Sequence, residues 1–268
     1  MDNMVVIDNL SFKYSNSFVF KKLSMSLSKG SFTTILGNNG SGKSTLVRLL
    51  TGLEDSNSCI MIDGVLVTRR DFSCIGNDIG VVFENTDNSL FSSVFEKLSF
   101  PLRCLGFSDD DVLYRLNEVS SLLGFSDLLD RELVTLSCGE MQLVNFGCAL
   151  ITKPKLLILD EAFSMMDDIT RVNMLCFLKH INKKYGVTII NITNDVEESV
   201  YGSDILVIDS GRVVIHDSKD NVYKQEKLLS SLNFDLPFMV NLSNKLSYYD
   251  LVDDVVFDMD EMVDLLWK

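Results

Sequence analysis

Hydrophobic and polar residues alternate in the N-terminal part of the chain, and this period of two is typical of β-strands that are buried on one face. The alternation runs through residues 5–14 and 18–28, and a second pair of apolar runs, residues 59–62 and 65–67, flanks the dipeptide Asp63-Gly64. An Asp-Gly pair between two such runs is a strong hairpin signal. The pattern predicts an antiparallel β subdomain at the N-terminus.

Farther along, further strands are expected from compact apolar runs, at residues 32–36, 79–83, 156–159, 187–192 and 205–208. A strand that is apolar at successive residues is buried on both faces, as in a parallel sheet with helices on either side. Helical segments separate several of these runs, including one at about 168–184 that Gly186 ends. We therefore expect an α/β fold with a mixed central sheet.

Between residues 90 and 150 the apolar residues recur at helical spacing, which predicts an inserted helical subdomain. One face of a helix there carries Val112, Leu116, Val119, Leu122 and Leu123, and Gly124 follows it. Glycine directly after a helix is typical of its C-terminal end. We expect this helix to bury that face and to end at Gly124.

The last segment, residues 233–268, combines acidic and apolar residues. From residue 235 onward it has eight acidic and two basic residues, a composition typical of a solvated surface. It also carries Leu236, Phe238, Val256, Leu265 and Trp267, which are unusual in a disordered tail. We therefore expect a small docked appendage at residues 233–268, following a first domain of residues 1–232.

The 268-residue chain has 24 Lys and Arg against 38 Asp and Glu, a net charge of −14. Such a chain repels phosphate backbones, so we expect no nucleic-acid partner. None of its apolar runs approaches the roughly 20 residues that span a bilayer, and the N-terminus lacks the features of a signal peptide. Six cysteines without a C-x-x-C pair and only two histidines argue against zinc or a disulfide framework. These features predict a cytosolic protein.

A glycine-rich segment directly after the expected strand 32–36 carries the clearest chemistry. It reads Gly37-Asn38-Asn39-Gly40-Ser41-Gly42-Lys43-Ser44, is followed by Thr45, and fits the phosphate-binding pattern G-x-x-x-x-G-K-[ST]. Its glycines let consecutive backbone N–H groups surround an anion, and the following helix adds a positive dipole end. Lys43 is expected to reach the β- and γ-phosphates, and Ser44 to bind Mg²⁺. The strand and helix context makes a chance turn a poor alternative.

A nucleotide site of this kind needs a second strand that ends in acidic residues, and residues 156–161, Leu-Leu-Ile-Leu-Asp-Glu, supply it. Asp160 lies where the sheet opens and is expected to hold Mg²⁺ through a water molecule. Glu161 is placed to orient or deprotonate an attacking water. A hydrophobic strand ending in Asp-Glu is common on its own, so its meaning here depends on the glycine-rich loop.

Between these motifs the segment 136–140, Leu-Ser-Cys-Gly-Glu, resembles the L-S-G-G-Q signature of the nucleotide-binding subunits of ABC transporters. Ser137 and Glu140 also fit a helix capping box, and both interpretations hold, because the signature acts as a helix N-terminus aimed at another subunit's γ-phosphate. Tyr14 stands where the family has an aromatic residue that stacks on adenine. The resemblance implies that Ser137, Gly139 and Glu140 contact the nucleotide of a partner subunit.

Residues 82–91, Val-Phe-Glu-Asn-Thr-Asp-Asn-Ser-Leu-Phe, are similar to the V-F-Q-N-P-D-N-Q-L-F stretch of energy-coupling factor (ECF) transporter ATPases, and residues 236–246 to that group's extra C-terminal segment. The resemblance covers essentially the whole chain. It implies a P-loop ABC ATPase with ATP and Mg²⁺ as cofactors and a dimer contact in the appendage. It also implies a second ATPase subunit, a transmembrane scaffold subunit and a substrate-binding membrane subunit as partners, at the cytoplasmic face of the membrane, for import of vitamins or transition-metal ions.

Four positions depart from the family pattern. Glu84 replaces the glutamine that contacts Mg²⁺ and the attacking water; a carboxylate still binds a hard cation but adds negative charge beside the triphosphate. Asn194 stands where the family has a histidine that touches the γ-phosphate, and an amide has no titratable proton. Cys138 replaces the first signature glycine, and Leu143 stands in place of an arginine.

Glu84, Asn194 and Glu161 belong to the site built on this chain's own phosphate-binding loop. Because losing one transition-state contact costs about 10²- to 10³-fold in rate, we expect this site to bind ATP and hydrolyse it slowly. A paralogous ATPase is then a better partner than a second copy. An alternative is a nucleotide-gated structural subunit whose partner performs all the chemistry. A soluble ABC ATPase of repair or translation fits less well, since those usually carry two cassettes or a long inserted element.

Overall fold

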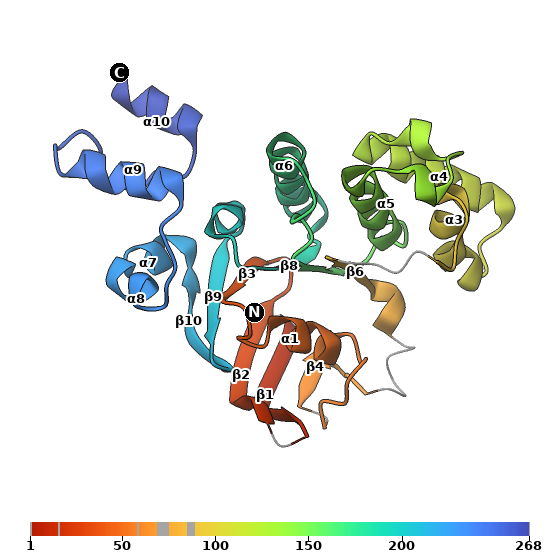
Figure 1. Ribbon diagram of the computed structural model, residues 1–268, viewed down its shortest axis with the longest axis horizontal. Coiled ribbons are helices and arrows are strands. Elements are labelled where there is room, and N and C mark those ends of the chain that lie inside the picture. The colour runs from red at the N-terminus through yellow and green to blue at the C-terminus, as the bar shows by residue number, and fades with distance from the viewer. Residues whose placement is uncertain (1, 16, 58, 69–74, 85–88, 268) are drawn as a thin grey trace.

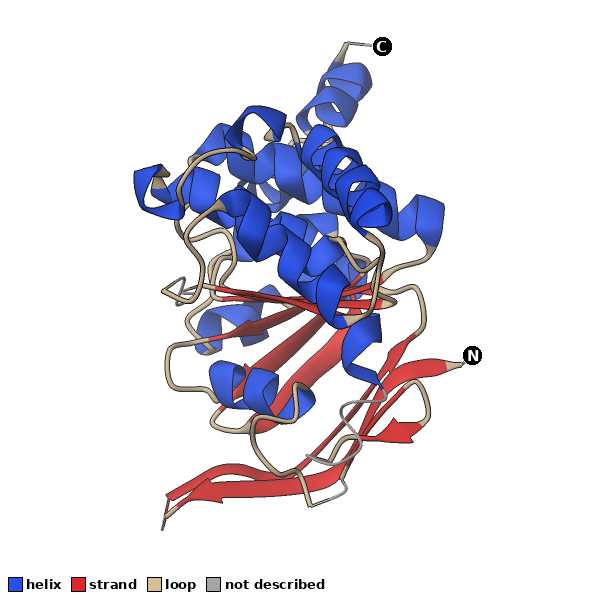
Figure 2. Cartoon of the chain, turned by 90° about the vertical axis from the view of Figure 1, so that its right-hand side faces the viewer, coloured by secondary structure: helices blue, strands red, loops and turns tan. Residues whose placement is uncertain are grey.

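The computed structural model describes residues 2–15, 17–57, 59–68, 75–84 and 89–267 of the chain. Figure 1 shows two β-sheets, helices packed around them and a helical C-terminal extension at one side. Turned by 90°, the structure shows a helical layer over one face of the central sheet (Figure 2). This layered arrangement confirms the α/β fold class predicted from the sequence.

The N-terminal sheet has the strand order β2-β1-β4-β5. Its strands are β1 (Asn3–Tyr14), β2 (Ser17–Ser28), β4 (Ile60–Ile62) and β5 (Val65–Leu66). All neighbouring strands in it are antiparallel. Asp63 and Gly64 have φ angles of 49° and 79°, the left-handed conformation that a tight two-residue hairpin requires at both positions. The antiparallel N-terminal strands and the hairpin at Asp63-Gly64 that the sequence predicted are confirmed.

The central sheet has the order β10-β9-β3-β8-β7-β6. Its strands are β3 (Phe32–Gly37), β6 (Ile79–Phe83), β7 (Leu156–Asp160), β8 (Thr188–Thr193), β9 (Asp204–Asp209) and β10 (Arg212–Ser218). All pairs are parallel except β9 with β10, so the sheet is mixed, as predicted. Because the carboxyl ends of parallel strands meet at one edge, Glu84, Glu161 and Asn194 follow strands that end beside the glycine-rich loop.

Helices cover both faces of the central sheet. Helix α1 (Lys43–Leu50) lies between the two sheets and packs against Leu156 and Ile158 of β7. Helix α6 (Asp168–Tyr185) packs against Leu157 and Leu159 of the same strand. Successive residues of a strand point to opposite faces, so the two helices lie on opposite sides of the sheet.

The helical subdomain consists of α3 (Val94–Cys104), α4 (Asp109–Leu123) and α5 (Cys138–Leu150), which lie together at one side of the sheet (Figure 1). Short 3-10 helices complete the fold, namely η1 (Gly76–Asp78), η2 (Ser126–Leu128), η3 (Leu133–Thr135) and η4 (Val196–Tyr201). Within the described residues, no helix is both long and apolar enough to cross a membrane.

Helix α4 buries Val112, Leu116 and Val119 and ends at Gly124, which has a φ of 74°, as predicted. Leu122 is 54% exposed, so its assignment to the buried face was wrong. At 100° per residue, Leu122 lies about 80° around the helix from the line through Val112. That rotation carries its side chain out of the interface.

The C-terminal extension consists of α7 (Lys219–Tyr223), α8 (Glu226–Ser231), α9 (Phe238–Ser247) and α10 (Met259–Leu266). Phe234 and Val240 pack with Tyr223 in a cluster that also includes Leu36 of the central sheet. A separate small cluster joins α9 to α10 and comprises Met239, Val252, Val256 and Met262. The extension is therefore attached mainly by the segment around α7 and the start of α9.

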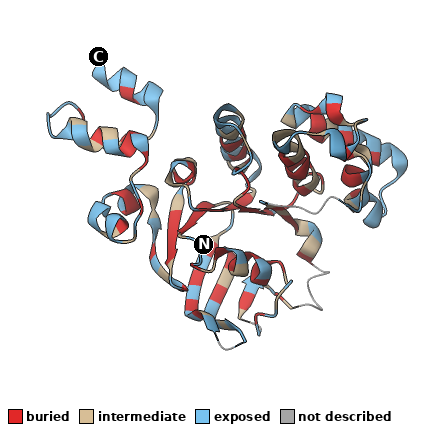
Figure 3. Ribbon diagram, viewed as in Figure 1, coloured by how far each residue is buried: buried red, intermediate tan, exposed pale blue. Residues whose placement is uncertain are grey.

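Several apolar residues of the extension are exposed. Phe238 is 60% exposed, Leu265 43% and Trp267 81%, whereas Val256 is buried and Leu236 partly buried. Figure 3 shows extensive exposed surface on α9 and α10. These three side chains are exposed because α9 and α10 pack on each other through a small cluster, which leaves their other faces open.

Candidate nucleotide-binding site

The glycine-rich loop connects β3 to α1 and presents an open helix N-terminus. Gly40 and Gly42 have φ angles of 82° and 107°, and a Cβ atom on Gly42 would lie 2.8 Å from the ring of Phe20. Within residues 37–50, all of which are described, helix α1 has neither a capping side chain nor an acidic residue in its first turn. Its first N–H groups are therefore available to an anion.

Lys43 is 7% exposed and folds back over its own loop. Its Nζ atom donates to the Gly37 carbonyl oxygen at 2.6 Å, and lies 3.4 Å from the Asn38 carbonyl oxygen. The same Nζ atom lies 3.4 Å from Oε1 of Glu161. The lysine thus connects the loop directly to the acidic end of β7. Ser44 is exposed at the start of α1, Thr45 is half-buried beside it, and Asn39 is exposed in the loop.

Asp160 ends β7 and is 8% exposed. Burial, reinforced by the neighbouring charges of Glu161 and Glu84, raises the pKa of Asp160 to about 6, against the opposing effect of Lys43. Among the described residues, Oδ1 of Asp160 and Oγ of Ser41 are buried side-chain oxygens without a hydrogen-bond partner. Both therefore have capacity for a ligand at the place where the sequence predicted one.

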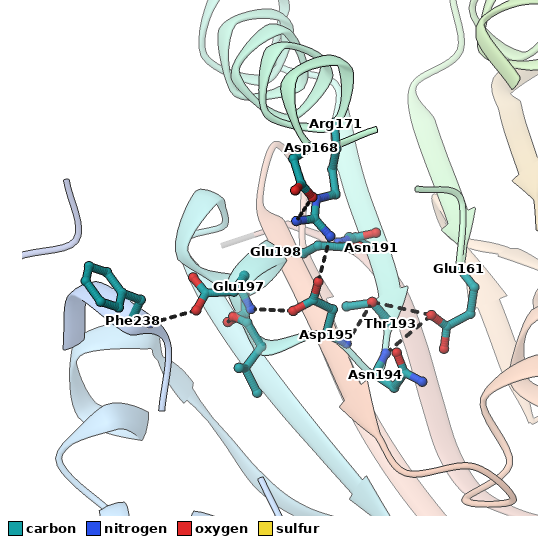
Figure 4. Close-up of polar contacts among 12 residues, drawn as sticks. Glu161, Asp168, Arg171, Asn191, Thr193, Asn194, Asp195, Glu197, Glu198 and Phe238 are labelled. Carbon is teal, nitrogen blue, oxygen red and sulfur yellow. Dashed lines mark hydrogen bonds and ion pairs between the residues drawn. The ribbon is translucent and has the colours of Figure 1, made fainter. Parts of the chain in front are cut away.

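Glu161 adopts a left-handed backbone conformation with a φ of 49°, which non-glycine residues rarely adopt and which often marks functional sites. Its N–H donates to the Ile192 carbonyl oxygen at 2.9 Å. Its Oε2 atom lies 3.4 Å from both Oγ1 of Thr193 and the backbone N of Asn194 (Figure 4). The carboxylate is therefore placed between Lys43 and the end of β8.

The segment after β8 is held by acidic side chains (Figure 4). Oδ2 of Asp195 pairs with Nη1 of Arg171 at 3.0 Å, and its Oδ1 accepts from the N–H of Glu197 at 2.9 Å. Oε1 of Glu197 in turn accepts from the N–H of Phe238, the first residue of α9, at 2.7 Å. These contacts connect the neighbourhood of the exposed Asn194 to the C-terminal extension.

Sequence reasoning missed a buried carboxyl group in η4. Glu198 is 4% exposed, and its Oε2 accepts from Nδ2 of Asn191 at 2.8 Å. Burial raises the pKa of Glu198 to about 7. The signal in the sequence is the polar Asn191 within the apolar run of β8. A polar side chain in a buried strand needs a hydrogen-bond partner.

The segment 136–140 begins helix α5 as predicted. Ser137 is the N-cap: its N–H donates to Oε2 of Glu140 at 2.7 Å, and its Oγ accepts from the N–H of Glu140 at 3.3 Å, so the capping box is confirmed. Glu140 also pairs with Arg131 at 3.0 Å. Cys138 is exposed at the start of the helix. These described contacts lie within the helical subdomain and do not join the segment to the glycine-rich loop.

Gly139 and Leu143 differ in how closely other residues of the chain surround their side-chain positions. Among the described residues, a Cβ atom on Gly139 would meet nothing within 4 Å, so none of their contacts requires a glycine there. Leu143, which replaces the family's arginine, is partly buried and packs against two hydrophobic clusters, one under α6 and one within the helical subdomain. An apolar side chain is therefore accommodated at that position.

Tyr14 lies at the end of β1 and is 40% exposed. Its ring contacts Phe12 edge to face at 5.0 Å, and its hydroxyl lies 3.4 Å from Oε1 of Glu54. An open aromatic face is thus available at the rim of the N-terminal sheet. Residues 85–88, which belong to the segment similar to ECF ATPases, lie outside the described residues.

Comparison with known proteins agrees with this geometry. A family model described as ABC transporter matches residues 20–164. An energy-coupling factor transporter ATP-binding protein of Streptococcus thermophilus is 34% identical over 271 residues, 99% of this chain and 98% of that protein; one from Ligilactobacillus salivarius is 31% identical, over 98% and 95%. The structure of cbiO1 from Clostridium perfringens, part of the ABC transporter complex cbiONQ, is 29% identical with a TM-score of 0.76, over 87% of this chain and 95% of that one.

The fold and the site together define the chain as an ABC-type ATPase. A family model that covers more than half of the chain and relatives that match it almost from end to end allow a narrower assignment. The chain belongs to the ABC transporter family and, within it, to the ATP-binding subunits of energy-coupling factor transporters.

Proposed function

We propose that the chain is one of two ATPase subunits that power an ECF-type importer of vitamins or transition-metal ions. Its partners are a paralogous ATPase subunit, a transmembrane scaffold subunit and a substrate-binding membrane subunit, at the cytoplasmic face of the cell membrane. The relatives named as ECF transporter ATP-binding proteins support this proposal. The observation that carries its chemistry is the buried Lys43, held between the carbonyl oxygens of its own loop and Glu161.

The glycine-rich loop binds the nucleotide in this proposal. The N–H groups at the start of α1 surround the phosphates. The ammonium group of Lys43 moves from Glu161 toward the β- and γ-phosphates and neutralises part of their charge. Ser41 uses its unpartnered hydroxyl on a phosphate oxygen. Tyr14 offers its exposed ring to the adenine base. Around these residues the loop itself contributes Gly37, Asn38, Asn39, Gly40, Gly42, Ser44 and Thr45.

The oxygen atoms of nearby side chains also fit Mg²⁺, which would offset phosphate charge when it is bound with ATP. We assign Ser44, Glu84 and Asp160 to its site, Asp160 acting through a water molecule. Mg²⁺ prefers one or two carboxylates together with phosphate oxygens and water. Among the described residues, no three His, Cys, Asp or Glu side chains are grouped so that they could hold a metal ion.

Glu161 orients the attacking water and accepts its proton. Its carboxylate is directed by Thr193 and the backbone of Asn194, and its left-handed backbone keeps it at the open edge of the sheet. The amide of Asn194 donates to the γ-phosphate in place of a histidine. Asn194 is exposed in this structure, so it is free to turn toward a bound nucleotide.

The partner subunit completes each site. The start of α5, with Ser137, Gly139 and Glu140, faces the γ-phosphate bound by the partner. The open space around Gly139 supports this assignment, because the glycine is then required by a close approach from outside the chain. The exposed apolar residues of the C-terminal extension supply a further contact between the two ATPase subunits.

Calorimetry on the full chain tests the nucleotide site. Binding of ATP with Mg²⁺ should give a measurable heat, and Lys43→Met should weaken it by about 10- to 100-fold, because a charge-assisted contact is worth roughly 1.5–3 kcal/mol. Lys153→Met, which removes an exposed lysine paired with Glu118, is the matched control. If the unmodified chain gives no heat of binding at millimolar ATP with Mg²⁺, the proposal is wrong.

The slow-site hypothesis has a separate test. Glu84→Gln combined with Asn194→His restores the family's residues, and we expect steady-state hydrolysis by the purified chain to rise by about tenfold or more. An unmodified chain that already hydrolyses ATP at the rate of the double variant would contradict the hypothesis. In the assembled transporter, Glu161→Gln distinguishes an active subunit, whose transport falls, from a nucleotide-gated structural one, whose transport is unchanged.

A further inference from the structure

A buried glutamine bridges the two strands whose ends carry Glu84 and Glu161. The parallel register of β6 and β7 ends with Phe83 opposite Asp160. Beyond that pair, Nε2 of Gln142, from helix α5, donates to the carbonyl oxygens of Phe83 at 3.1 Å and Ala162 at 2.8 Å. One amide nitrogen thus uses both of its hydrogens to continue the connection where the backbone ladder stops.

Two further buried side chains lead to this bridge. Oε1 of Gln142 accepts from Nδ2 of Asn145 at 2.8 Å, and Oδ1 of Asn145 accepts from Nζ of Lys97 on helix α3. Gln142 is 3% exposed, Asn145 7% and Lys97 4%. Burial lowers the pKa of Lys97, so the amide oxygen of Asn145 offsets part of the cost of placing the ammonium there.

The direction of every bond in this series is determined by its two ends. An ammonium group can only donate, and a backbone carbonyl can only accept. Asn145 must therefore turn its oxygen to Lys97 and its nitrogen to Gln142, and Gln142 must turn its nitrogen to the two carbonyl groups. The ammonium group on α3 and the two carbonyl groups together therefore set the orientation of both amides.

We propose that Gln142 is a positioning residue that holds the carboxylates of Glu84 and Glu161 in register, and that Lys97 sets its orientation through Asn145. Phe83 directly precedes Glu84, and Ala162 directly follows Glu161. A shift of either carbonyl group moves the adjoining carboxylate relative to the γ-phosphate. The inference rests on the roles proposed above for these carboxylates, and it makes their placement depend on two helices of the helical subdomain.

Substitutions at Lys97 separate polarity from packing. Lys97→Arg keeps a donor, Lys97→Met removes it, and Lys97→Glu presents an acceptor that forces Asn145 to turn over. A cavity of about 520 Å³ borders Lys97 and Asn145, and it gives the larger arginine side chain of Lys97→Arg room. We measure single-turnover hydrolysis with the full chain in excess over ATP and compare each rate with that of the unmodified chain. We expect Lys97→Arg to keep the rate within about twofold, Lys97→Met to lower it by about fivefold and Lys97→Glu to lower it by tenfold or more.

The Kd for ATP measured without Mg²⁺ should change by less than about twofold in these variants, because the phosphate-binding loop lies outside the series and Glu84 is assigned to the cation. Lys153→Met is the control that should change neither quantity. Equal rates for Arg, Met and Glu at position 97 would overturn the proposal, as would a rate and a Kd that deteriorate together. Unchanged hydrolysis in Glu161→Gln would instead refute the role of Glu161.

A spectroscopic readout is independent of activity. The side-chain NH₂ protons of Gln142, assigned by their loss in Gln142→Met, should exchange slowly with solvent in the unmodified chain. Lys97→Met should shift these resonances and increase their exchange by about tenfold or more, whereas Lys153→Met should not. A Gln142 side chain that exchanges rapidly in the unmodified chain would contradict the bridge itself.

Discussion

The side-chain amide of Asn38 in the glycine-rich loop donates a hydrogen bond of 2.8 Å to the backbone carbonyl oxygen of Leu232, 194 residues farther along the chain. Leu232 directly follows helix α8, and the C-terminal extension continues from there. The loop that we assign to the phosphates is therefore in direct contact with the C-terminal extension, between its helices α8 and α9.

Asn38→Ala should lower the free energy of unfolding of the nucleotide-free chain by about 1 kcal/mol, because a partly buried carbonyl oxygen loses its donor. Urea denaturation measures this change. Asn39→Ala, at an exposed neighbouring position, should change the free energy of unfolding by less than about 0.5 kcal/mol. Equal effects of the two substitutions would show that the contact with Leu232 does not stabilise the fold.

Glu197→Ala should loosen helix α9. Pro237 is the N-cap of this helix and makes no side-chain capping bond, and the carboxylate of Glu197 accepts from the first N–H in its place. Losing such a cap costs about 1 kcal/mol, so amide hydrogen exchange in residues 238–247 should rise by about fivefold. Glu226→Ala, in the first turn of α8, should leave α9 unchanged. An unaltered exchange rate in Glu197→Ala would contradict the capping role.

Asp160→Asn should stabilise the nucleotide-free chain at high pH. Burial and nearby carboxylates raise the pKa of Asp160 from its usual 3.8 to about 6. The folded state therefore favours the protonated form, and the stability that protonation gives is complete below about pH 4 and lost as the pH rises through 6. At about pH 8 the variant should gain up to roughly 3 kcal/mol. Urea denaturation at pH 4 and 8 checks this, and a variant less stable at pH 8 would refute it.

The same substitution should weaken ATP binding in the presence of Mg²⁺, since the lost carboxylate belongs to the proposed cation site. The gain in stability and the loss in affinity thus have opposite signs, as expected for a group whose burial is retained for function.

Glu198→Gln should remove a second pH dependence. The pKa of Glu198 is raised to about 7, mainly by burial, so its contribution to stability is present below about pH 4.5 and lost as the pH rises through 7. A glutamine can keep the bond from Asn191 and also donate to Oδ1 of Asn191, which is buried without a partner among the described residues. The variant should therefore be more stable than the unmodified chain at pH 8. Glu226→Gln is the exposed control, and identical pH profiles for all three proteins would exclude the effect.

Much of the site could be predicted because its signals are local. The run from Gly37 to Ser44 contains the glycines, the lysine and the helix start that a phosphate loop needs, and the apolar residues before Asp160 indicate a buried strand. The parallel register then necessarily brings these ends to one edge of the sheet. Leu122 was placed wrongly, because an apolar residue shows that burial is possible and does not show which neighbour is present to cover it.

By itself, the sequence determined the strands, the principal helices, the glycine-rich loop and the acidic pair, since each depends on residues that are neighbours along the chain. The tertiary structure decided which distant groups meet: Gln142 with the carbonyl groups of Phe83 and Ala162, and Glu197 with the N-terminus of α9. Backbone donors and acceptors are the same for every residue type. A side chain's choice among them therefore depends on how strands and helices pack in space, which no local pattern specifies.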